Sequence, residues 1–379
     1  MNRSSIATVA RQSLSAGLAA AILCAFAPWA CSAGGGQSTT GSGGAGGSAA
    51  VSSSSSGGAS AATSSSSSGD IGFDGGLGDA GDAGGCVGDD PPALDSGVAA
   101  PVLAAAFEPF YTVFDLGPIP GMPSGHLGGC VIKQGDPGTL LVAGDSEAQT
   151  GAIYEIKVKR NQCGHIIGFV GTASLVAQTP YVDANLLYGA NGVLLYTQWP
   201  VNQISQLPMG ATAPAATTDM NGLGVVSSVS GLGFVPPGLP AAGGLRTVTW
   251  SSGNWYHLGL GAGAMGLYVI SNPVEAASPL PGGPGGFAYV PKGSPGFPKQ
   301  SLIISEWSAD TVAVYEVDDQ GDPIVASRQD FFTSFPKPWG AYFEPETGDY
   351  LFLTWGPTPD RVYVVQGFLP PPPPPPPPN

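Results

Sequence analysis

Charged residues, and basic ones above all, are scarce in this chain. Only 10% of the 379 residues are charged, and 12 Lys and Arg stand against 27 Asp and Glu, which gives a net charge of −15 at pH 7. A protein that binds nucleic acid needs clustered Lys and Arg to neutralise phosphates. The composition therefore argues against nucleic acid as a partner.

Two common catalytic patterns are also missing. The three histidines, His126, His165 and His257, lie far apart and show no metal-binding spacing such as H-E-x-x-H. No G-x-S-x-G sequence occurs after the low-complexity N-terminal region, so the usual signature of a serine hydrolase is absent. Neither a histidine-based metal site nor a serine nucleophile is indicated.

Glycine and proline are abundant instead, at 59 and 38 residues, and a pair of strands recurs along the chain. The clearest copy is 300–317, where two strands are joined by a short polar turn. The equivalent first strands begin at residues 140, 194, 245, 302 and 351. A period of about fifty residues with several strands per repeat is typical of a β-propeller. The sequence thus predicts an all-β fold of five four-stranded blades, or six if a long repeat conceals a degenerate one.

The two ends of the repeat region predict how the ring closes. The last repeat ends near residue 368 without a fourth strand, and the segment 109–116 (PFYTVFDL) forms an unpaired strand before the first repeat. Propellers avoid exposed edges by closing the ring, often with a strand from the other terminus. We therefore expect 109–116 to complete the last blade.

The N-terminus has the features of an export signal. Two arginines precede an apolar run at 18–29, which is too short for the ~20 residues of a membrane-spanning helix. Cys31, followed by a Gly/Ser tract, resembles the lipid-attachment site of bacterial lipoproteins. The alternative is ordinary cleavage after Ala27 or Ala33 and release of a secreted protein.

Four segments follow from these boundaries. They are a signal peptide (1–30), an acylated Cys31 with a disordered linker rich in Gly, Ser and Asp (31–98), the propeller (99–369) and a polyproline tail (370–379). The linker has too little apolar surface to offset the entropy of ordering. The predicted location is therefore the cell envelope, with a lipid anchor in the membrane.

The repeats resemble the NHL and SMP-30/gluconolactonase-like propeller superfamily, over about residues 125–368. The phrases that carry the resemblance are GAYFEPETGDYLFLTW at 340–355 and PDRVYVV at 359–365. The resemblance implies that a divalent cation, calcium or magnesium, is held in the central channel by Glu, Asn and Asp. The best candidate pair of ligands is Asp183 with Asn185, at the entry to an inner strand.

Aromatic residues mark one face of the predicted propeller. Four of the five second strands end in tryptophan, namely Trp199, Trp250, Trp307 and Trp355. They could form an aromatic rim that binds a sugar or peptide, or each could pack between neighbouring blades. A residue repeated in nearly every blade is more often structural, so we expect at least two of the four to be buried.

Acidic and amide side chains fall on the same predicted face, namely Asp145, Glu147, Asp183, Asn185, Glu306 and Asp310. All of these except Glu147 complete the set of candidate ligand-binding residues.

Three cysteines remain after export and acylation. Cys130 lies on an inner strand and is too far from Cys163 for a disulfide, so we expect it to be buried and free. A bond between Cys86 and Cys163 is left open.

These features predict a monomeric, non-enzymatic binding or scaffold module at the cell envelope, with an unidentified protein or carbohydrate ligand. The competing hypothesis is a divalent-cation-dependent lactonase. A central channel filled by glycine would favour the binding module. A channel in which three or more protein oxygens hold a cation would favour the enzyme.

Overall fold

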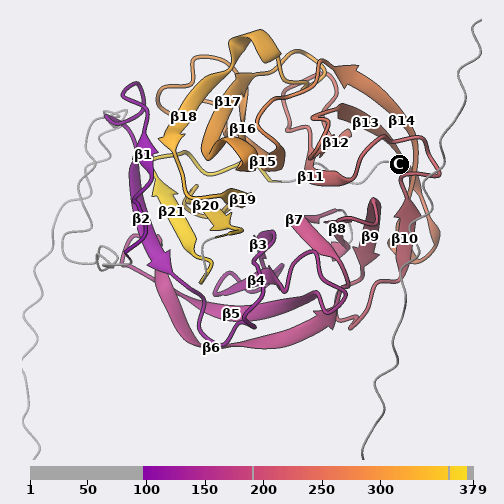
Figure 1. Cartoon of the computed structure of the whole chain (residues 1–379), viewed down its shortest axis with the longest axis horizontal. Coiled ribbons are helices and arrows are strands. Elements are labelled where there is room, and N and C mark those ends of the chain that lie inside the picture. Colours follow the sequence, from indigo (N-terminus) through magenta and orange to yellow (C-terminus); the bar gives the residue numbers. More distant parts are fainter. Residues whose placement is uncertain (1–96, 190–191, 357–358, 374–379) are drawn as a thin grey trace, which may run out of the picture. The chain divides into compact units, whose positions relative to one another are not determined.

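Five antiparallel β-sheets stand around a common axis in the computed structural model (Figure 1), which describes residues 97–189, 192–356 and 359–373. In each sheet the first strand lies nearest the axis and contacts its counterparts in neighbouring sheets. The all-β, five-bladed propeller predicted from the sequence is confirmed. The signal peptide, Cys31 and nearly all of the linker lie outside the described residues, as do residues 374–379 of the tail.

Blade one contains β3 (Cys130–Ile132), β4 (Thr139–Gly144), β5 (Ala152–Arg160) and β6 (Ile166–Gln178). Blade two contains β7 (Val182–Tyr188), β8 (Leu194–Gln198), β9 (Gln203–Leu207) and β10 (Ala216–Asp219). Blade three contains β11 (Val229–Phe234), β12 (Leu245–Thr249), β13 (Trp255–Ala262) and β14 (Tyr268–Ala277). Blade four contains β15 (Pro284–Tyr289), β16 (Ser301–Glu306), β17 (Thr311–Glu316) and β18 (Gln329–Ser334). Blade five contains β19 (Pro338–Phe343), β20 (Tyr350–Thr354), β21 (Val362–Gln366) and β2 (Thr112–Gly117).

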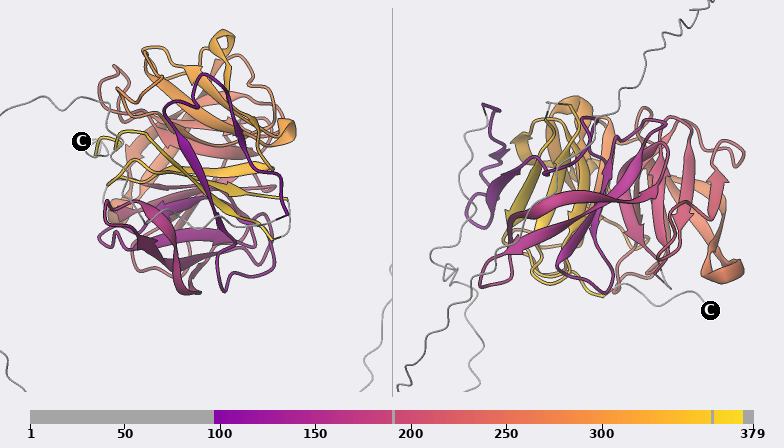
Figure 2. Two further views of the ribbon diagram at one scale, coloured as in Figure 1. Left: turned by 90° about the vertical axis from the view of Figure 1, so that its left-hand side faces the viewer. Right: turned by 90° about the horizontal axis from the view of Figure 1, so that it is seen from below.

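The ring closes as the sequence predicts. Strand β2 pairs antiparallel with β21, with Thr112 opposite Gln366 and Phe114 opposite Val364. Figure 2 shows the indigo N-terminal strand beside the yellow strands of the last blade. A short strand that the sequence did not indicate, β1 (Val102–Leu103), pairs with β18 and makes blade four five-stranded. The N-terminal segment therefore covers the outer edges of two blades, which leaves fewer unpaired backbone groups.

One predicted strand is shorter than expected. The segment 324–332 reads as a continuous strand, but Val325–Ser327 forms a 3₁₀ turn and β18 begins at Gln329. The hydroxyl of Ser327 donates to the carbonyl of Ile324 at 2.6 Å and accepts the N–H of Glu316 at 2.8 Å. These local bonds compete with ladder pairing, which explains the turn.

The hydrophobic core is divided among the five junctions between blades. At the junction of blades one and two, for example, Leu141 and Ile153 pack with Leu186 and Tyr196, and all four are buried. The junction of blades four and five is mostly aromatic, with Phe335 in contact with Phe352 and Tyr363 at ring-centroid distances of 5.1 and 5.0 Å. Each blade therefore buries both faces against its neighbours, as a closed ring requires.

Backbone and glycine fill the axis of the ring. A Cβ added to Gly340 on β19 would lie 2.2 Å from the carbonyl oxygen of Gly128, and one on Gly231 of β11 would lie 2.5 Å from that of Gly285. Inner strands thus approach more closely than side chains would permit. The central channel is thus filled by glycine backbone, the arrangement that favours a binding module.

Cys130 is buried at 1% exposure and is free, as expected. Cys163 is disulfide-bonded. Its bond with Cys86 was left open by the sequence, and Cys86 lies outside the described residues. In the part of the chain that is described, no helix is long and apolar enough to span a membrane.

Candidate functional site

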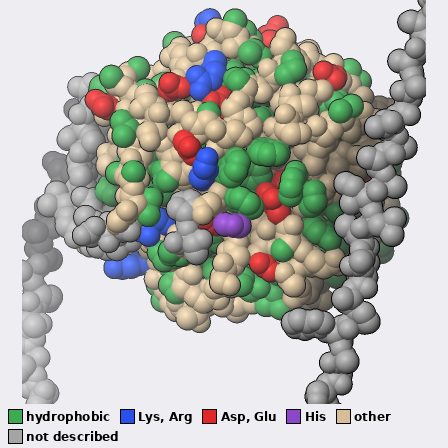
Figure 3. Space-filling model, in the orientation of Figure 1, with side chains coloured by type: hydrophobic (Ala, Val, Ile, Leu, Met, Phe, Trp, Pro, Cys, Tyr) green, Lys and Arg blue, Asp and Glu red, His purple; other side chains and the backbone are tan. Residues whose placement is uncertain are grey.

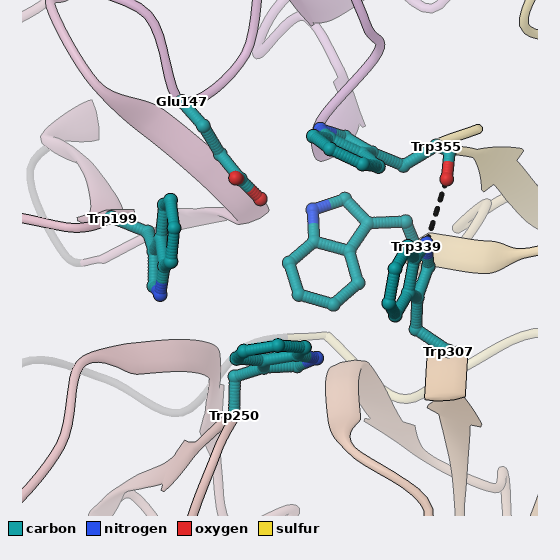
Figure 4. A pocket seen from close by; sticks show the side chains of 6 residues that line it. All are labelled: Glu147, Trp199, Trp250, Trp307, Trp339 and Trp355. Carbon is teal, nitrogen blue, oxygen red and sulfur yellow. Dashed lines mark hydrogen bonds between the residues drawn. The ribbon is translucent and has the colours of Figure 1, made fainter. Parts of the chain in front are cut away.

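One indole directly follows the second strand in four of the five blades. Trp199, Trp250, Trp307 and Trp355 come immediately after β8, β12, β16 and β20. Because the second strands of a propeller all run toward the same face, the four side chains meet there around the axis (Figure 4). Figure 3, viewed along the same axis as Figure 1, shows hydrophobic side chains gathered beside the centre of this face.

Blade one departs from this pattern and supplies an acid. After β4 the chain turns through Asp145 and Glu147, whose φ angles of 51° and 64° are in the left-handed region. The N–H of Glu147 donates to the carbonyl of Val182 at 2.9 Å, which fixes this loop against blade two. Glu147 thereby takes the place around the axis that an indole occupies in the other blades.

The indoles touch edge to face and enclose a pocket. Ring centroids are 6.2 Å apart for Trp199 and Trp250, 5.8 Å for Trp250 and Trp307, and 5.6 Å for Trp307 and Trp355. The planes of successive rings cross at 85°, 68° and 77°. Trp339, near the start of β19, completes the lining at 6.4 Å from Trp307. The pocket has a volume of about 90 Å³, and its lining consists of five indoles and one carboxyl group.

The expected burial of the repeated tryptophans is wrong. All four are half-buried, and each contributes to the pocket lining. The buried indoles are instead Trp339, at 3% exposure, and Trp255, at 0%. Trp339 was missed because it lies at the start of an inner strand, at a position where the other blades have no tryptophan.

Glu147 lies against a second carboxyl group, that of Asp183 on β7. Asp183 has no exposed surface, and its Oδ1 accepts the indole N–H of Trp339 at 3.0 Å. Burial raises the pKa of Glu147 from 4.5 to about 7, against a smaller lowering by its hydrogen bond with Asp183. Burial, and then the charge of Glu147, raises the pKa of Asp183 well above 3.8.

The other deeply buried carboxylates of the propeller differ, because each is matched with a cationic or imidazole side chain. These pairs are Glu344 with Arg160, Glu306 with Arg328, Asp349 with His165, Asp322 with Arg246 and His257, and Asp360 with His126. Within the described ranges, neither Glu147 nor Asp183 forms an ion pair with Lys, Arg or His. The site thus contains two adjacent acids without a countercharge from the described chain.

Asn185, the other half of the predicted metal-binding pair, is engaged elsewhere. Its Oδ1 accepts the N–H groups of Leu232 at 3.1 Å and Phe287 at 3.2 Å, and its Nδ2 donates to the carbonyl of Ala341 at 3.2 Å. Asn185 thus ties three inner strands together near the axis. Among the described residues, no group of three or more His, Cys, Asp or Glu is arranged to hold a metal ion. The donor set therefore does not fit the divalent cation that the family resemblance implies.

The remaining acidic candidates lie outside the pocket lining. Asp145 accepts a hydrogen bond from the hydroxyl of Thr150. Glu306, at 1% exposure, is held by Arg328 and by the hydroxyl of Tyr315 at 2.7 Å. Asp310 is exposed and pairs with Lys337 at 3.0 Å.

A cation already sits on one of the indoles. The Nζ of Lys337 lies 4.6 Å from the centroid of Trp307, on a ring that also lines the pocket. The indole N–H of Trp307 donates to the carbonyl of Trp355 at 2.6 Å, which holds the two blades in register (Figure 4).

A second hollow has a volume of about 220 Å³ and is lined in part by His126. The His126 ring stacks on Trp355 of the Trp pocket at a centroid distance of 4.0 Å. Its Nδ1 is 3.0 Å from Oδ2 of Asp360, which also accepts the N–H of Leu127. These contacts hold His126 between Asp360 and Trp355.

No family model and no curated protein matches this chain. Solved structures that resemble it include a gluconolactonase from Xanthomonas campestris, at 14% identity and a TM-score of 0.40, covering 74% of this chain and 99% of that one. A PQQ-bound aldose sugar dehydrogenase from Streptomyces coelicolor has 14% identity and a TM-score of 0.38, covering 66% and 83%. The apo aldose sugar dehydrogenase from Escherichia coli has 12% identity and a TM-score of 0.36, covering 66% and 85%. Scores this low assign neither a reaction nor a ligand to this chain.

Proposed function

We propose that the protein is a binding module that captures a small group of its ligand in the Trp-lined pocket. The observation that carries this proposal is the convergence of five indoles, from four blades, on one partly open pocket. Half-buried aromatic rings that are not needed to fill the core are typical of ligand sites, where rigid apolar surface is combined with a few polar groups.

The filled axis supports binding rather than hydrolysis. The lactonase hypothesis requires an oxygen-lined cation site in the channel. Glycine backbone occupies the axis instead, and the side-chain amide of Asn185 already forms three hydrogen bonds to inner strands. No arrangement of described residues specifically favours the lactonase over the binding module.

We further propose that Cys31 anchors the module to the cell envelope. The support is the sequence alone: a signal-like segment, the cysteine, and a long Gly/Ser-rich spacer before the propeller. A flexible spacer of that length would hold the binding face roughly 45 Å from the anchor, at about 5–6 Å times the square root of residue number. The exported and anchored state remains a prediction.

Intrinsic fluorescence tests the binding proposal directly, because five of the six tryptophans that follow Trp29 line the pocket. The purified protein is titrated with methyl glycosides, N-acetylated dipeptides and small amines. We expect a saturable change with one of these classes, which Trp250→Ala abolishes and Phe110→Ala leaves intact. Phe110 is a 46%-exposed aromatic residue outside the pocket and controls for loss of a surface ring. Absence of a saturable signal with all three classes would contradict the proposal.

A further inference from the structure

We propose that the group captured in the Trp pocket is a substituted ammonium ion, with the indoles around its alkyl surface and Glu147 and Asp183 balancing its charge. This inference rests on the proposed binding function and specifies its ligand class. Three independent features of the site support it.

The first feature is a missing countercharge. Buried carboxylates are rarely found without a cationic partner, since removing an ion from water is costly. The propeller follows this rule at Glu306, Glu344 and Asp349, which are matched by arginine or histidine. Glu147 and the fully buried Asp183 break it together: they contact each other, and neither has an ion-pair partner among the described residues. A cationic ligand would supply the charge that the chain omits.

The second feature is the arrangement of the rings. A planar base, or the apolar face of a sugar, stacks on one broad aromatic face. Successive indoles here instead cross at 68° to 85° and surround the pocket on several sides. Such an aromatic cage suits a compact, rounded cation, because each ring is attracted to positive charge through its quadrupole. The contact of Lys337 with Trp307, at 4.6 Å, shows that an indole of this cage accepts an ammonium on its outer side.

The third feature is size and polarity. The volume of about 90 Å³ is smaller than the roughly 150 Å³ of an apolar cavity that admits benzene. It suits a group of a few heavy atoms, such as a methylated ammonium. Figure 4 shows the carboxyl group of Glu147 pointing between Trp199 and Trp339, so the acid faces the space that the cation would occupy.

A divalent metal ion would satisfy the charge but not the site. Calcium takes six to eight oxygen ligands and magnesium requires an octahedron of them. The pocket lining offers the carboxyl oxygens of one residue, Glu147, surrounded by indole carbons that cannot ligate. An ion with an alkyl surface uses both the acids and the rings.

The test compares choline with 3,3-dimethyl-1-butanol, its uncharged carbon analogue, by tryptophan fluorescence of the purified protein at pH 8. We expect choline to bind about tenfold or more tightly than the analogue, as a desolvated cation–π site predicts. Glu147→Gln should weaken choline about tenfold or more and leave the analogue nearly unchanged, since it removes charge and little volume. Glu108→Gln, at an exposed site away from the pocket, should behave like the unchanged protein.

The outcomes separate this inference from the binding function on which it rests. Equal or tighter binding of the alcohol would overturn the ammonium proposal and preserve a binding pocket for uncharged groups. Choline binding that Glu147→Gln leaves unchanged would likewise overturn the assigned role of the acids. No saturable response to either compound, together with none to the glycosides and peptides, would overturn both. If Glu147→Gln does not fold, Trp250→Ala serves as the second variant and should abolish the saturable response to choline.

Discussion

Ionisation of Glu147 should make the folded protein less stable as the pH rises. Burial raises the pKa of this carboxyl from 4.5 to about 7. Each unit by which the pKa differs between the folded and unfolded states changes the free energy of unfolding by about 1.4 kcal/mol. The raised pKa of Glu147 therefore makes the free energy of unfolding about 3 kcal/mol larger at low pH than at high pH. Asp183 is the titratable group in contact with Glu147, and its own pKa is raised, so its charge does not offset the effect.

The sign follows from proton linkage. Below about pH 4.5 the carboxyl is protonated in both states and the stabilisation is fully present. Between pH 4.5 and 7 the unfolded chain releases the proton while the folded protein retains it, so the free energy of unfolding decreases. Above about pH 7 the folded protein ionises too, and the loss reaches its full value.

Urea unfolding, followed by circular dichroism at pH 4.5, 6, 7 and 8, measures this effect as a difference between variants. The free energy of unfolding of the unchanged protein, minus that of Glu147→Gln, should fall by about 3 kcal/mol from pH 4.5 to 8. Subtraction cancels the titration of groups that do not interact with Glu147. Glu108→Gln is the control for the loss of an exposed carboxyl group away from the pocket. Parallel pH profiles for the unchanged protein and Glu147→Gln would refute the argument that Glu147 lacks a countercharge.

Two further predictions concern the anchor and the ring. Cys31→Ala should move the mature protein from the membrane to the soluble fraction and abolish labelling by a fatty-acid probe; retained labelling would contradict lipidation at this residue. Deletion of 1–100 should leave a cooperatively melting propeller, because β2 and its pairing with β21 are kept. Deletion of 1–118 should expose the edge of β21 and promote aggregation. Equal melting temperatures for the two truncations would argue against closure at this strand.

Much of the fold could be predicted because its signals are periodic and local. Strand alternation, turn-forming residues and the fifty-residue repeat locate nearly every inner and second strand. Closure through 109–116 followed from one missing strand and one spare strand, and the pairing of β2 with β21 confirms it. Strand β1 gave no such signal, since two residues are too short to show alternation.

The site was only partly predictable. The repeat placed four tryptophans on one face, but whether they face the core or a pocket depends on how far the blades splay, which no local pattern encodes. Trp339 and Glu147 also line the pocket, but neither occupies the position that the tryptophans share in the repeat. The hydrogen bond of the Trp339 indole to Asp183 joins residues far apart in the chain. The hydrogen bonds of Asn185 to three inner strands are equally invisible to sequence spacing.

The loop of blade one gives a physical reason to regard its acid as more than a variation of the repeat. Asp145 and Glu147 both adopt left-handed φ angles, a conformation that costs non-glycine residues on the order of 1 kcal/mol each. Seven other non-glycine residues of the described chain also have left-handed φ angles, so this conformation alone does not mark a site. What distinguishes the loop is that it directs the Glu147 carboxyl toward a cage of indoles, beside a buried acid that has no ion-pair partner among the described residues. Two adjacent acids without a countercharge are unfavourable for the empty fold, and a cation in the pocket would offset that cost.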